Sequence, residues 1–351
     1  MNYPTANPPN PFRLTDREYF EELPPAELTV FEDSSRTILS RNDSPDLPFR
    51  YSVNPYRGCY HACAYCYARP THEYLDLGAG TDFDRKLLVK LAAPELLRAA
   101  FDKPSWRGET IMFSGVTDCY QPIENHYGLT RKLLEVCLEY RNPVAIITKS
   151  ALVERDLELL LQLQERAAVD VTVSIPFFDP AEARAIEPFV TTPERRLRAV
   201  ERLAKAGLSV GVMVAPIIPG LNDDQMVKIL EHARQAGASS AGYVLLRLPG
   251  SVKDVFLGRL TAAFPERAAK ILSRLRQTRD GQLYDAQFGV RGRGQGRYAE
   301  MIAQLFATTT RRLGFVEREP LVEGASAPST FLRPERTPRR PPTPQLSLPL
   351  L

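Results

Sequence analysis

Short apolar runs alternate with longer amphipathic segments through the middle of the chain. Runs of β-branched and apolar residues, bounded by glycine, proline or polar residues, predict six strands at 49–53, 109–114, 143–148, 169–175, 208–214 and 243–248. Helical spacing between them predicts helices at 93–101, 123–140, 153–165, 193–206 and 223–236. This alternation is typical of parallel βαβ units in an α/β fold, and six strands are too few for a complete eight-stranded barrel.

Local signals mark several helix ends. Thr192 before Pro193 predicts an N-cap followed by proline at the first helical position. Gly207 and Gly237 predict the ends of the helices that precede them. Two further helices are expected between 252 and 277 and a last one at 297–313, with a flexible basic loop at 288–297 before it.

The predicted elements divide the chain into four parts. Residues 1–48 are expected to form a proline-rich, irregular N-terminal arm, and 49–250 the core barrel. Residues 251–320 are expected to form a helical extension. Residues 321–351, rich in proline, threonine, serine and arginine, are predicted to be a disordered tail.

Composition and charge restrict the function only broadly. The 45 basic and 42 acidic residues give a net charge of +3, which neither requires nor excludes a nucleic-acid partner. No apolar run approaches the ~20 residues that span a membrane, and no secretory signal is visible at the N-terminus. Five cysteines in 351 residues do not suggest a disulfide framework, so a cytoplasmic protein with reduced thiols is expected.

Three of the five cysteines lie in one loop after the first predicted strand. Cys59, Cys63 and Cys66 are spaced C-x3-C-x2-C, and no fourth cysteine is nearby. Soft thiolates select iron–sulfur clusters or zinc. Three thiolates would hold three corners of a [4Fe–4S] cube and leave one iron open to a small molecule. A zinc site completed by His61 or His72 is the alternative.

With Tyr65 as its aromatic residue, the motif C-x3-C-x-(aromatic)-C resembles the cluster motif of radical S-adenosylmethionine (SAM) enzymes. The resemblance implies a partial (β/α)6 barrel of the TIM type and a [4Fe–4S] cluster on Cys59, Cys63 and Cys66. It also implies SAM on the open iron with its adenine beside Tyr65, cleavage of SAM to a 5′-deoxyadenosyl radical, and an electron donor of the flavodoxin or ferredoxin type. The following Cys-Tyr-Ala-Arg-Pro-Thr-His-Glu-Tyr resembles the branch related to spore photoproduct lyase.

The same resemblance implies that SAM is bound after the second strand. The family usually carries a Gly-Gly-Glu-like motif there, and this chain does not. Backbone carbonyls near Ser114 and Gly115, with Thr117 or Asp118, would instead hold the SAM amino group, since a carboxylate suits an ammonium. Capping of the following turn is the alternative for Asp118.

Three further strand ends carry candidates by resemblance. Ser174 would contact the ribose or the methionine carboxylate of SAM, or be structural, and Ile218 in a Pro-Gly turn would cover the adenine. Lys149 would meet a carboxylate or phosphate, or be solvated. Cys119 lies near the place where spore photoproduct lyase has a hydrogen-donating cysteine; a buried structural residue is the alternative.

Two regions near the C-terminus suggest macromolecular partners. A group of arginines could contact nucleic-acid phosphates or be solvated: Arg291, Arg293, Arg297, Arg311 and Arg312. The last residues resemble the peptide with which bacterial polymerases and repair proteins bind the DNA sliding clamp. The residues expected to bind are Gln345, Leu346, Leu348, Pro349 and Leu350, although so short a match can arise by chance.

The sequence thus predicts a radical SAM enzyme of the lyase or repair type, acting on nucleic acid and on damaged DNA in particular. Modification of RNA, protein or a small molecule is an alternative, because the same radical serves all these substrates. A non-catalytic, metal-binding adaptor of the replication clamp is the other alternative.

Overall fold

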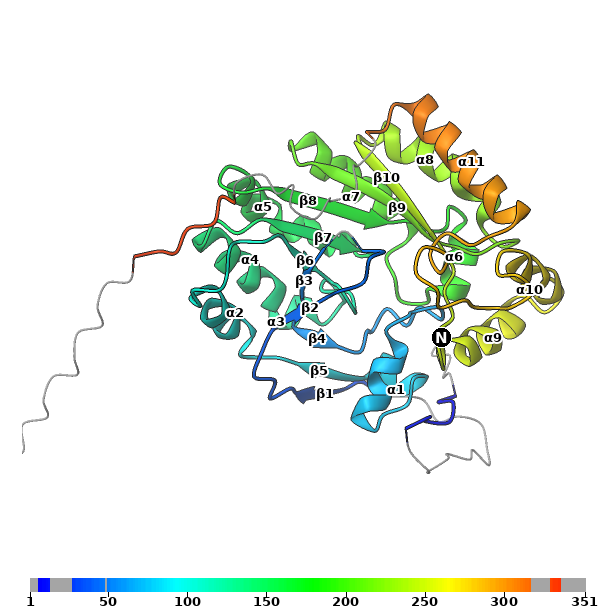
Figure 1. Cartoon of the computed structure of the whole chain (residues 1–351), viewed down its shortest axis with the longest axis horizontal. Coiled ribbons are helices and arrows are strands. Elements are labelled where there is room, and N and C mark those ends of the chain that lie inside the picture. The colour runs from blue at the N-terminus through cyan, green and yellow to red at the C-terminus, as the bar shows by residue number, and fades with distance from the viewer. Residues whose placement is uncertain (1–5, 13–26, 48, 317–328, 336–351) are drawn as a thin grey trace, which may run out of the picture.

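The computed structural model describes residues 6–12, 27–47, 49–316 and 329–335, and its centre is a seven-stranded sheet (Figure 1). The strand order is β10-β9-β8-β7-β6-β3-β2. The bounds are Leu39–Arg41 for β2, Tyr51–Val53 for β3, Ile111–Phe113 for β6, Val144–Thr148 for β7, Val169–Ser174 for β8, Val210–Ile217 for β9 and Ser240–Leu245 for β10. All neighbours from β3 to β10 are parallel, and β2 is antiparallel to β3. The six expected strands and the partial barrel are confirmed.

Amphipathic helices connect the parallel strands and lie along the outside of the sheet (Figure 1). They are α2 (Ala93–Phe101), α4 (Leu129–Glu139), α5 (Leu157–Gln164), α7 (Pro193–Lys205) and α8 (Met226–Gln235). Each buries its apolar stripe against the strands, as Leu133, Leu134 and Cys137 of α4 do. The predicted cap of α7 is confirmed, since the Thr192 hydroxyl accepts a hydrogen bond from the Arg195 N–H.

Four helical regions differ from the prediction. The helix expected at 123–140 is divided into α3 (Glu124–Tyr127) and α4, because Gly128 between them has φ +61°, a left-handed conformation that ends a helix. Short 3₁₀ helices, η2 (Ala151–Asp156) and η3 (Asp223–Gln225), precede α5 and α8. An additional short helix, α6 (Pro180–Ile186), follows β8 and is capped by Asp179.

A second, three-stranded sheet lies beside the first. It contains β1 (Thr29–Glu32), β5 (Lys86–Val89) and β4 (Tyr56–Arg57), in the order β1-β5-β4. The expectation of irregular structure through residue 48 is therefore wrong for β1 and β2. β1 pairs with β5, far along the chain, whereas β2 pairs with β3 across a connection of nine residues, 42–50. Between β4 and β5 are η1 (Arg69–Leu75) and α1 (Thr81–Arg85).

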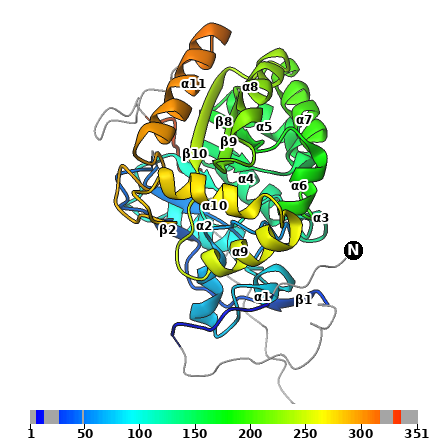
Figure 2. The ribbon, with the colours of Figure 1, turned by 90° about the vertical axis from the view of Figure 1, so that its right-hand side faces the viewer.

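The three helices expected after the barrel are present. It contains α9 (Val252–Ala263), α10 (Ala268–Gln277) and α11 (Arg297–Leu313). Helices α9 and α10 lie side by side in front of the barrel in Figure 2. They pack Val252, Phe256 and Ile271 into the apolar cluster that includes Cys63 and Tyr65. Within the described part of the chain, no helix is both long and apolar enough to cross a membrane.

Residues 329–335, which we call the strap, bind to the outer helices. The ring of Phe331 lies 5.7 Å from that of Phe101 and 6.0 Å from that of Tyr140. The Arg333 guanidinium donates to the carbonyls of Phe101, Lys103 and Trp106 at 2.7–3.0 Å, where a cation meets the C-terminal end of α2. The prediction of disorder throughout 321–351 is wrong for these residues, because Phe331 and Arg333 find specific partners.

Candidate metal and cofactor site

The three-cysteine loop follows β4 and is fixed from two sides. The Cys59 N–H donates to the carbonyl of Phe83 in α1 (3.0 Å), and the Ala64 N–H donates to that of Ile186 in α6 (3.0 Å). Cys59 and Cys63 are buried, Cys66 is half-buried, and all three are free thiols. The loop is therefore held by backbone bonds that do not depend on the cysteine side chains.

Burial and spacing bear on what the three thiols could bind. Burial raises the pKa of all three thiols, and the nearby charges of Asp118 and Glu187 raise those of Cys59 and Cys63 further. Among the described residues, no three His, Cys, Asp or Glu side chains converge on one ion position. In a cube each thiolate binds a different iron, so wider spacing is expected, whereas the ligands of zinc share one metal.

A buried polar network supports the aromatic residue of the motif. The Tyr65 hydroxyl donates to Glu187, whose other oxygen accepts from the Arg196 guanidinium at 2.7 Å. Arg196 also donates to the carbonyl of Ser174 at the end of β8 (2.9 Å). All four residues are buried. The network therefore connects the cysteine loop, helix α7 and the end of β8. It includes Tyr65 and Ser174, two of the predicted SAM contacts.

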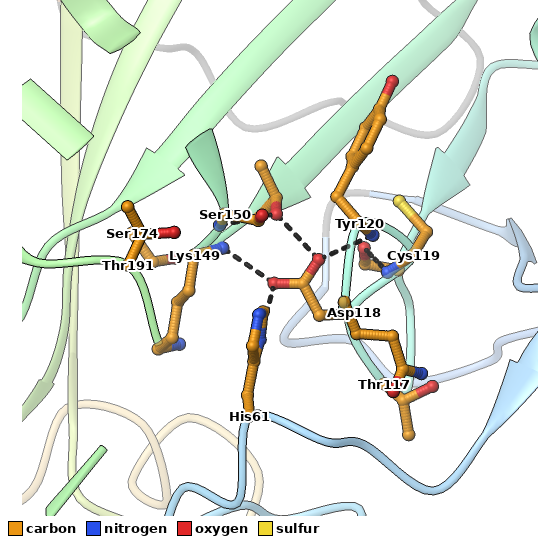
Figure 3. A network of polar contacts seen from close by, with 12 residues as sticks. His61, Thr117, Asp118, Cys119, Tyr120, Lys149, Ser150, Ser174 and Thr191 are labelled. Carbon is orange, nitrogen blue, oxygen red and sulfur yellow. Dashed lines mark hydrogen bonds and ion pairs between the residues drawn. The ribbon is translucent and has the colours of Figure 1, made fainter. Parts of the chain in front are cut away.

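Asp118 lies at the centre of a second network (Figure 3). Its carboxylate accepts from the Thr148 hydroxyl (2.7 Å) and from the N–H groups of Lys149 (2.8 Å) and Tyr120 (2.9 Å). His61 Nδ1 lies 3.5 Å away, and burial lowers the pKa of this imidazole. A carboxylate can accept about four hydrogen bonds, and in Asp118 three of these are already made by groups of the chain itself. Asp118 thus joins the ends of β6 and β7, and its contact with SAM stays a prediction.

Other predicted SAM contacts after β6 also lie at this end of the sheet. Ser114 is buried and has φ +84°, an uncommon conformation for a side-chain-bearing residue and one often found at functional sites. A Cβ on Gly115 would lie 2.5 Å from the Cβ of Ser52, so only glycine fits beside β3. The Gly115 carbonyl accepts from the Tyr67 hydroxyl (2.9 Å), and the Thr117 hydroxyl donates to a β4 carbonyl (3.0 Å).

Cys119 belongs to the core of the sheet. It is 0% exposed, and burial raises its pKa. Its carbonyl accepts from the Thr130 hydroxyl of α4 at 2.6 Å. Figure 3 shows its thiol directed away from Asp118 and His61. This placement does not support a hydrogen-donor role, which stays a prediction to be tested.

Ile218 and Lys149 lie near the cysteine loop. Ile218 is buried in the same apolar cluster as Cys63 and Tyr65, and its N–H donates to Asn222 (2.6 Å). This N–H group is therefore occupied within the chain, and the contact of Ile218 with the adenine stays a prediction. The Lys149 ammonium lies 5.6 Å from the centre of the Tyr65 ring, so a positive charge faces the predicted SAM site.

Several site residues escaped prediction. Glu187 and Arg196 lie in separate helical segments without a motif. Tyr67 is 49% exposed. Its position directly after Cys66 was the one feature of the sequence that could have identified it as a site residue. The predicted partner-binding residues lie outside the described part of the chain: Gln345, Leu346, Leu348, Pro349 and Leu350.

A cavity of about 780 Å³ lies between η2 and the start of α7. Its lining includes His61, Ser150 and Thr191 from the network around Asp118, but not Asp118 itself. Arg195 and Arg202 at its wall both pair with Glu154, at 2.9 and 3.2 Å. This cavity lies beside the strand ends, and its paired charges favour no ligand.

Similar proteins agree with this geometry. Residues 53–233 match the family model of the radical SAM superfamily. An uncharacterised protein of Mycobacterium tuberculosis is 41% identical over 253 residues, which are 71% of this chain and 73% of that protein. An uncharacterised protein of Methanocaldococcus jannaschii is 33% identical over 178 residues, 51% of this chain and 64% of that protein.

Solved structures of spore photoproduct lyase share the fold. A mutant form with bound AdoMet and dinucleoside spore photoproduct has a TM-score of 0.56 at 18% identity, covering 82% of this chain and 78% of that one. The three spaced thiols, the parallel strand ends and the family match lead to one conclusion. The chain belongs to the radical SAM superfamily, whose members bind a [4Fe–4S] cluster and SAM.

Proposed function

We propose that this protein is a radical SAM enzyme of the lyase or repair type that acts on nucleic acid, and on damaged DNA in particular. The observation that carries the substrate class is a basic and aromatic surface near the strand ends. Arg247 lies 5.9 Å from the Tyr67 ring and Arg291 lies 4.4 Å from the Phe288 ring. Arginines bind phosphates, and exposed rings stack on bases. That spore photoproduct lyase binds a dinucleoside photoproduct adds support.

In this proposal the residues of the chain bind and orient. Cys59, Cys63 and Cys66 hold the cluster, and Tyr65 and Lys149 face SAM. When bound and reduced, the cluster supplies the electron that breaks a C–S bond of SAM and yields the 5′-deoxyadenosyl radical. An electron carrier of the flavodoxin or ferredoxin type would reduce it, in a cytoplasm that keeps thiols reduced.

Anaerobic reconstitution tests the proposal. The protein is given iron, sulfide, SAM and dithionite with UV-irradiated DNA, intact DNA or RNA, and 5′-deoxyadenosine and the nucleic acid are analysed by mass spectrometry. We expect 5′-deoxyadenosine and a change in the irradiated DNA. The Cys59→Ala/Cys63→Ala/Cys66→Ala variant should lose both, whereas Cys137→Ala, a buried cysteine of α4, should keep both.

The other outcomes separate the alternatives. If 5′-deoxyadenosine forms and RNA is altered instead, the chemistry stands and the substrate is RNA. If no nucleic acid changes, a protein or small-molecule substrate is favoured. A chain that takes up zinc in preference to a cluster and ignores SAM would refute enzyme activity and favour a metal-binding adaptor.

We also propose that the C-terminal peptide binds the DNA sliding clamp. Support comes from the sequence from Gln345 to Leu350 and from the strap, which anchors the preceding chain on α2 and α4. Deletion of 345–351 should abolish binding to an immobilised bacterial clamp and leave SAM cleavage unchanged. Clamp binding that survives the deletion would refute the assignment.

A further inference from the structure

A loop bridges the two edges of the main sheet. Residues 285–296, between α10 and α11, extend from β10 to the hairpin that joins β2 and β3. On the β10 side the Gly292 carbonyl accepts from the Leu245 N–H (2.9 Å). On the hairpin side the Gly289 N–H donates to the Asp46 carboxylate (2.7 Å). Figure 2 shows this loop beside the β2–β3 region. It therefore lies across the open side of the partial barrel.

Asp46 is held in the way a protein holds an anionic ligand. One carboxylate oxygen accepts the Gly289 N–H, and the other lies 2.5 Å from the Arg291 Nε. Burial alone would raise the pKa of Asp46, but these two donors, together with the charges of Arg291 and Arg247, lower it. A backbone N–H and a guanidinium on one anion also form a common phosphate-binding arrangement.

Arg247 provides an independent sign of a ligand. It follows β10, its guanidinium lies 5.9 Å from the centre of the Tyr67 ring, and its charge acts on Asp46. Its Nε atom is buried and, within the described part of the chain, has no hydrogen-bond acceptor. A buried donor without a partner is costly, and an incoming phosphate oxygen would satisfy it. The charges of Arg247 and Arg291 thus both act on Asp46, and Arg291 contacts it directly.

The contact between the loop and Asp46 can open at little cost. None of the residues from 281 to 298 is buried, and Phe288 is 54% exposed. Few buried contacts mean low local stability. The base of the loop is firmly held, because Arg279 is buried and donates to the carbonyls of Val290 (3.0 Å) and Arg291 (2.9 Å). Motion would therefore be confined to the tip near Phe288 and to the Arg291 side chain.

We propose that Asp46 competes with a substrate phosphate for a site formed by Arg291, Arg247 and the Gly289 N–H, and that the phosphate opens the 285–296 loop by displacing Asp46. This inference rests on the proposed nucleic-acid function and adds its phosphate contact and its gate. The displaced tip would leave Phe288 free to stack on a base. Asp46 would also reject ligands that lack a strong anion.

Binding of a short fluorescein-labelled thymidine oligonucleotide, measured anaerobically by anisotropy, tests the site. Asp46→Asn should bind up to about fivefold more tightly, as expected for loss of one competing ion pair. Arg291→Ala should bind about five- to tenfold more weakly, and its slope of log affinity against log salt should be shallower by about 0.7, the share of one phosphate. In the double variant, Asp46→Asn should bring no gain.

A matched control and a second readout complete the test. Arg98→Ala breaks an exposed pair with Glu139 (2.9 Å) between α2 and α4, outside the arginines considered for phosphate contact, and should leave affinity and slope unchanged. Hydrogen exchange in 285–296 should be faster in Asp46→Asn than in wild type. If exchange or binding is the same in all variants, the Asp46 gate is refuted and the proposed function stands. If no variant binds the oligonucleotide, the nucleic-acid assignment and the phosphate site both fail.

Discussion

Glu187 and Arg196 illustrate what single residues contribute to this site. Both are buried beside the Tyr65 ring, where either charge alone would lack solvent and partner. Together with the Tyr65 hydroxyl and the Ser174 carbonyl they form a satisfied set, apart from the Arg196 Nε, which has no partner in the described structure. The pair fixes the orientation of the cysteine loop against β8.

The energetic coupling of this pair can be measured. Glu187→Ala and Arg196→Ala should each lower the free energy of unfolding by about 3–5 kcal/mol, because each leaves an unpaired buried charge. The double variant should lose about 1–3 kcal/mol less than the sum of the two single losses. Anaerobic urea denaturation of the four proteins gives these values. Additive losses would show that the two residues do not act as a pair.

Cys119 gives a second prediction at this scale. Because its thiol is buried and turned from Asp118, Cys119→Ala should release 5′-deoxyadenosine at the wild-type rate and give the same nucleic-acid product. The native thiol should also resist labelling by a thiol reagent, since burial raises its pKa. Altered products at an unchanged rate of SAM cleavage would instead support the hydrogen-donor role.

Among the elements, η1 connects the cysteine loop to the second sheet. Arg69 donates to the Cys63 carbonyl (2.9 Å) and pairs with Asp84 of α1 (2.9 Å). His72 lies with its Nε2 atom 2.8 Å from the Lys86 carbonyl of β5 and its ring near Phe83. The geometry at Lys86 requires an Nε2–H donor and is satisfied by a neutral imidazole.

This element should weaken in mild acid. Burial lowers the pKa of His72 from 6.5 to about 4, so the folded protein binds fewer protons than the unfolded chain between these values. Stability from this group is present above pH 6.5 and is lost as the pH falls, by about 1 kcal/mol between pH 7.5 and 5.5. Burial raises the pKa of Asp84 to about 6, so this group favours the folded state as the pH falls, opposite to His72. The His72 contribution must therefore be measured as a difference between wild type and a His72 variant.

Urea unfolding of wild type and His72→Gln at both pH values isolates the His72 contribution. The variant keeps a donor for the Lys86 carbonyl and should lose about 1 kcal/mol less on acidification. His126→Gln, at an exposed position of α3, should behave as wild type. Equal losses in wild type and His72→Gln would refute the assignment.

Elements with local signals were predicted well, and those formed by distant pairing were not. The six parallel strands, α7 and α11 follow from runs of apolar residues, a cap and a regular stripe. β1, β2, β4 and β5 are short and partly exposed, so only their partners define them. The site shows the same division. The motif identified the three cysteines, whereas the place of Asp118 in a hydrogen-bond network depends on Thr148, 30 residues away, and could not be predicted from a local pattern.

In the whole molecule, two segments near the C-terminal end of the sequence pack against a barrel formed by residues that precede them. The loop at 285–296 joins the edges of the sheet, and the strap at 329–335 covers the ends of α2 and α4. The Phe331 ring of the strap packs against an aromatic cluster formed by Phe101, Trp106 and Tyr140. It thus adds stability on the outer helices, away from the cysteine loop.

The contribution of the strap is testable. Phe331→Ala should lower the free energy of unfolding by about 1–2 kcal/mol, because a half-buried ring loses part of its apolar contact. Leu332→Ala, the neighbouring residue at 51% exposure, should cost much less and serves as the control. Anaerobic urea denaturation measures both. Identical curves for the two variants would show that the ring of Phe331 does not anchor the strap.

The strap also has a consequence for synthesis. Arg333 binds the carbonyl of Phe101, 232 residues earlier in the chain. At about 5–20 residues per second, the C-terminal end of α2 waits roughly 10–50 s for this partner. Its aromatic group stays uncovered on the ribosome during that time, a period in which chaperones recognise such surfaces. A chain that stops before residue 329 would therefore leave translation with this surface still exposed.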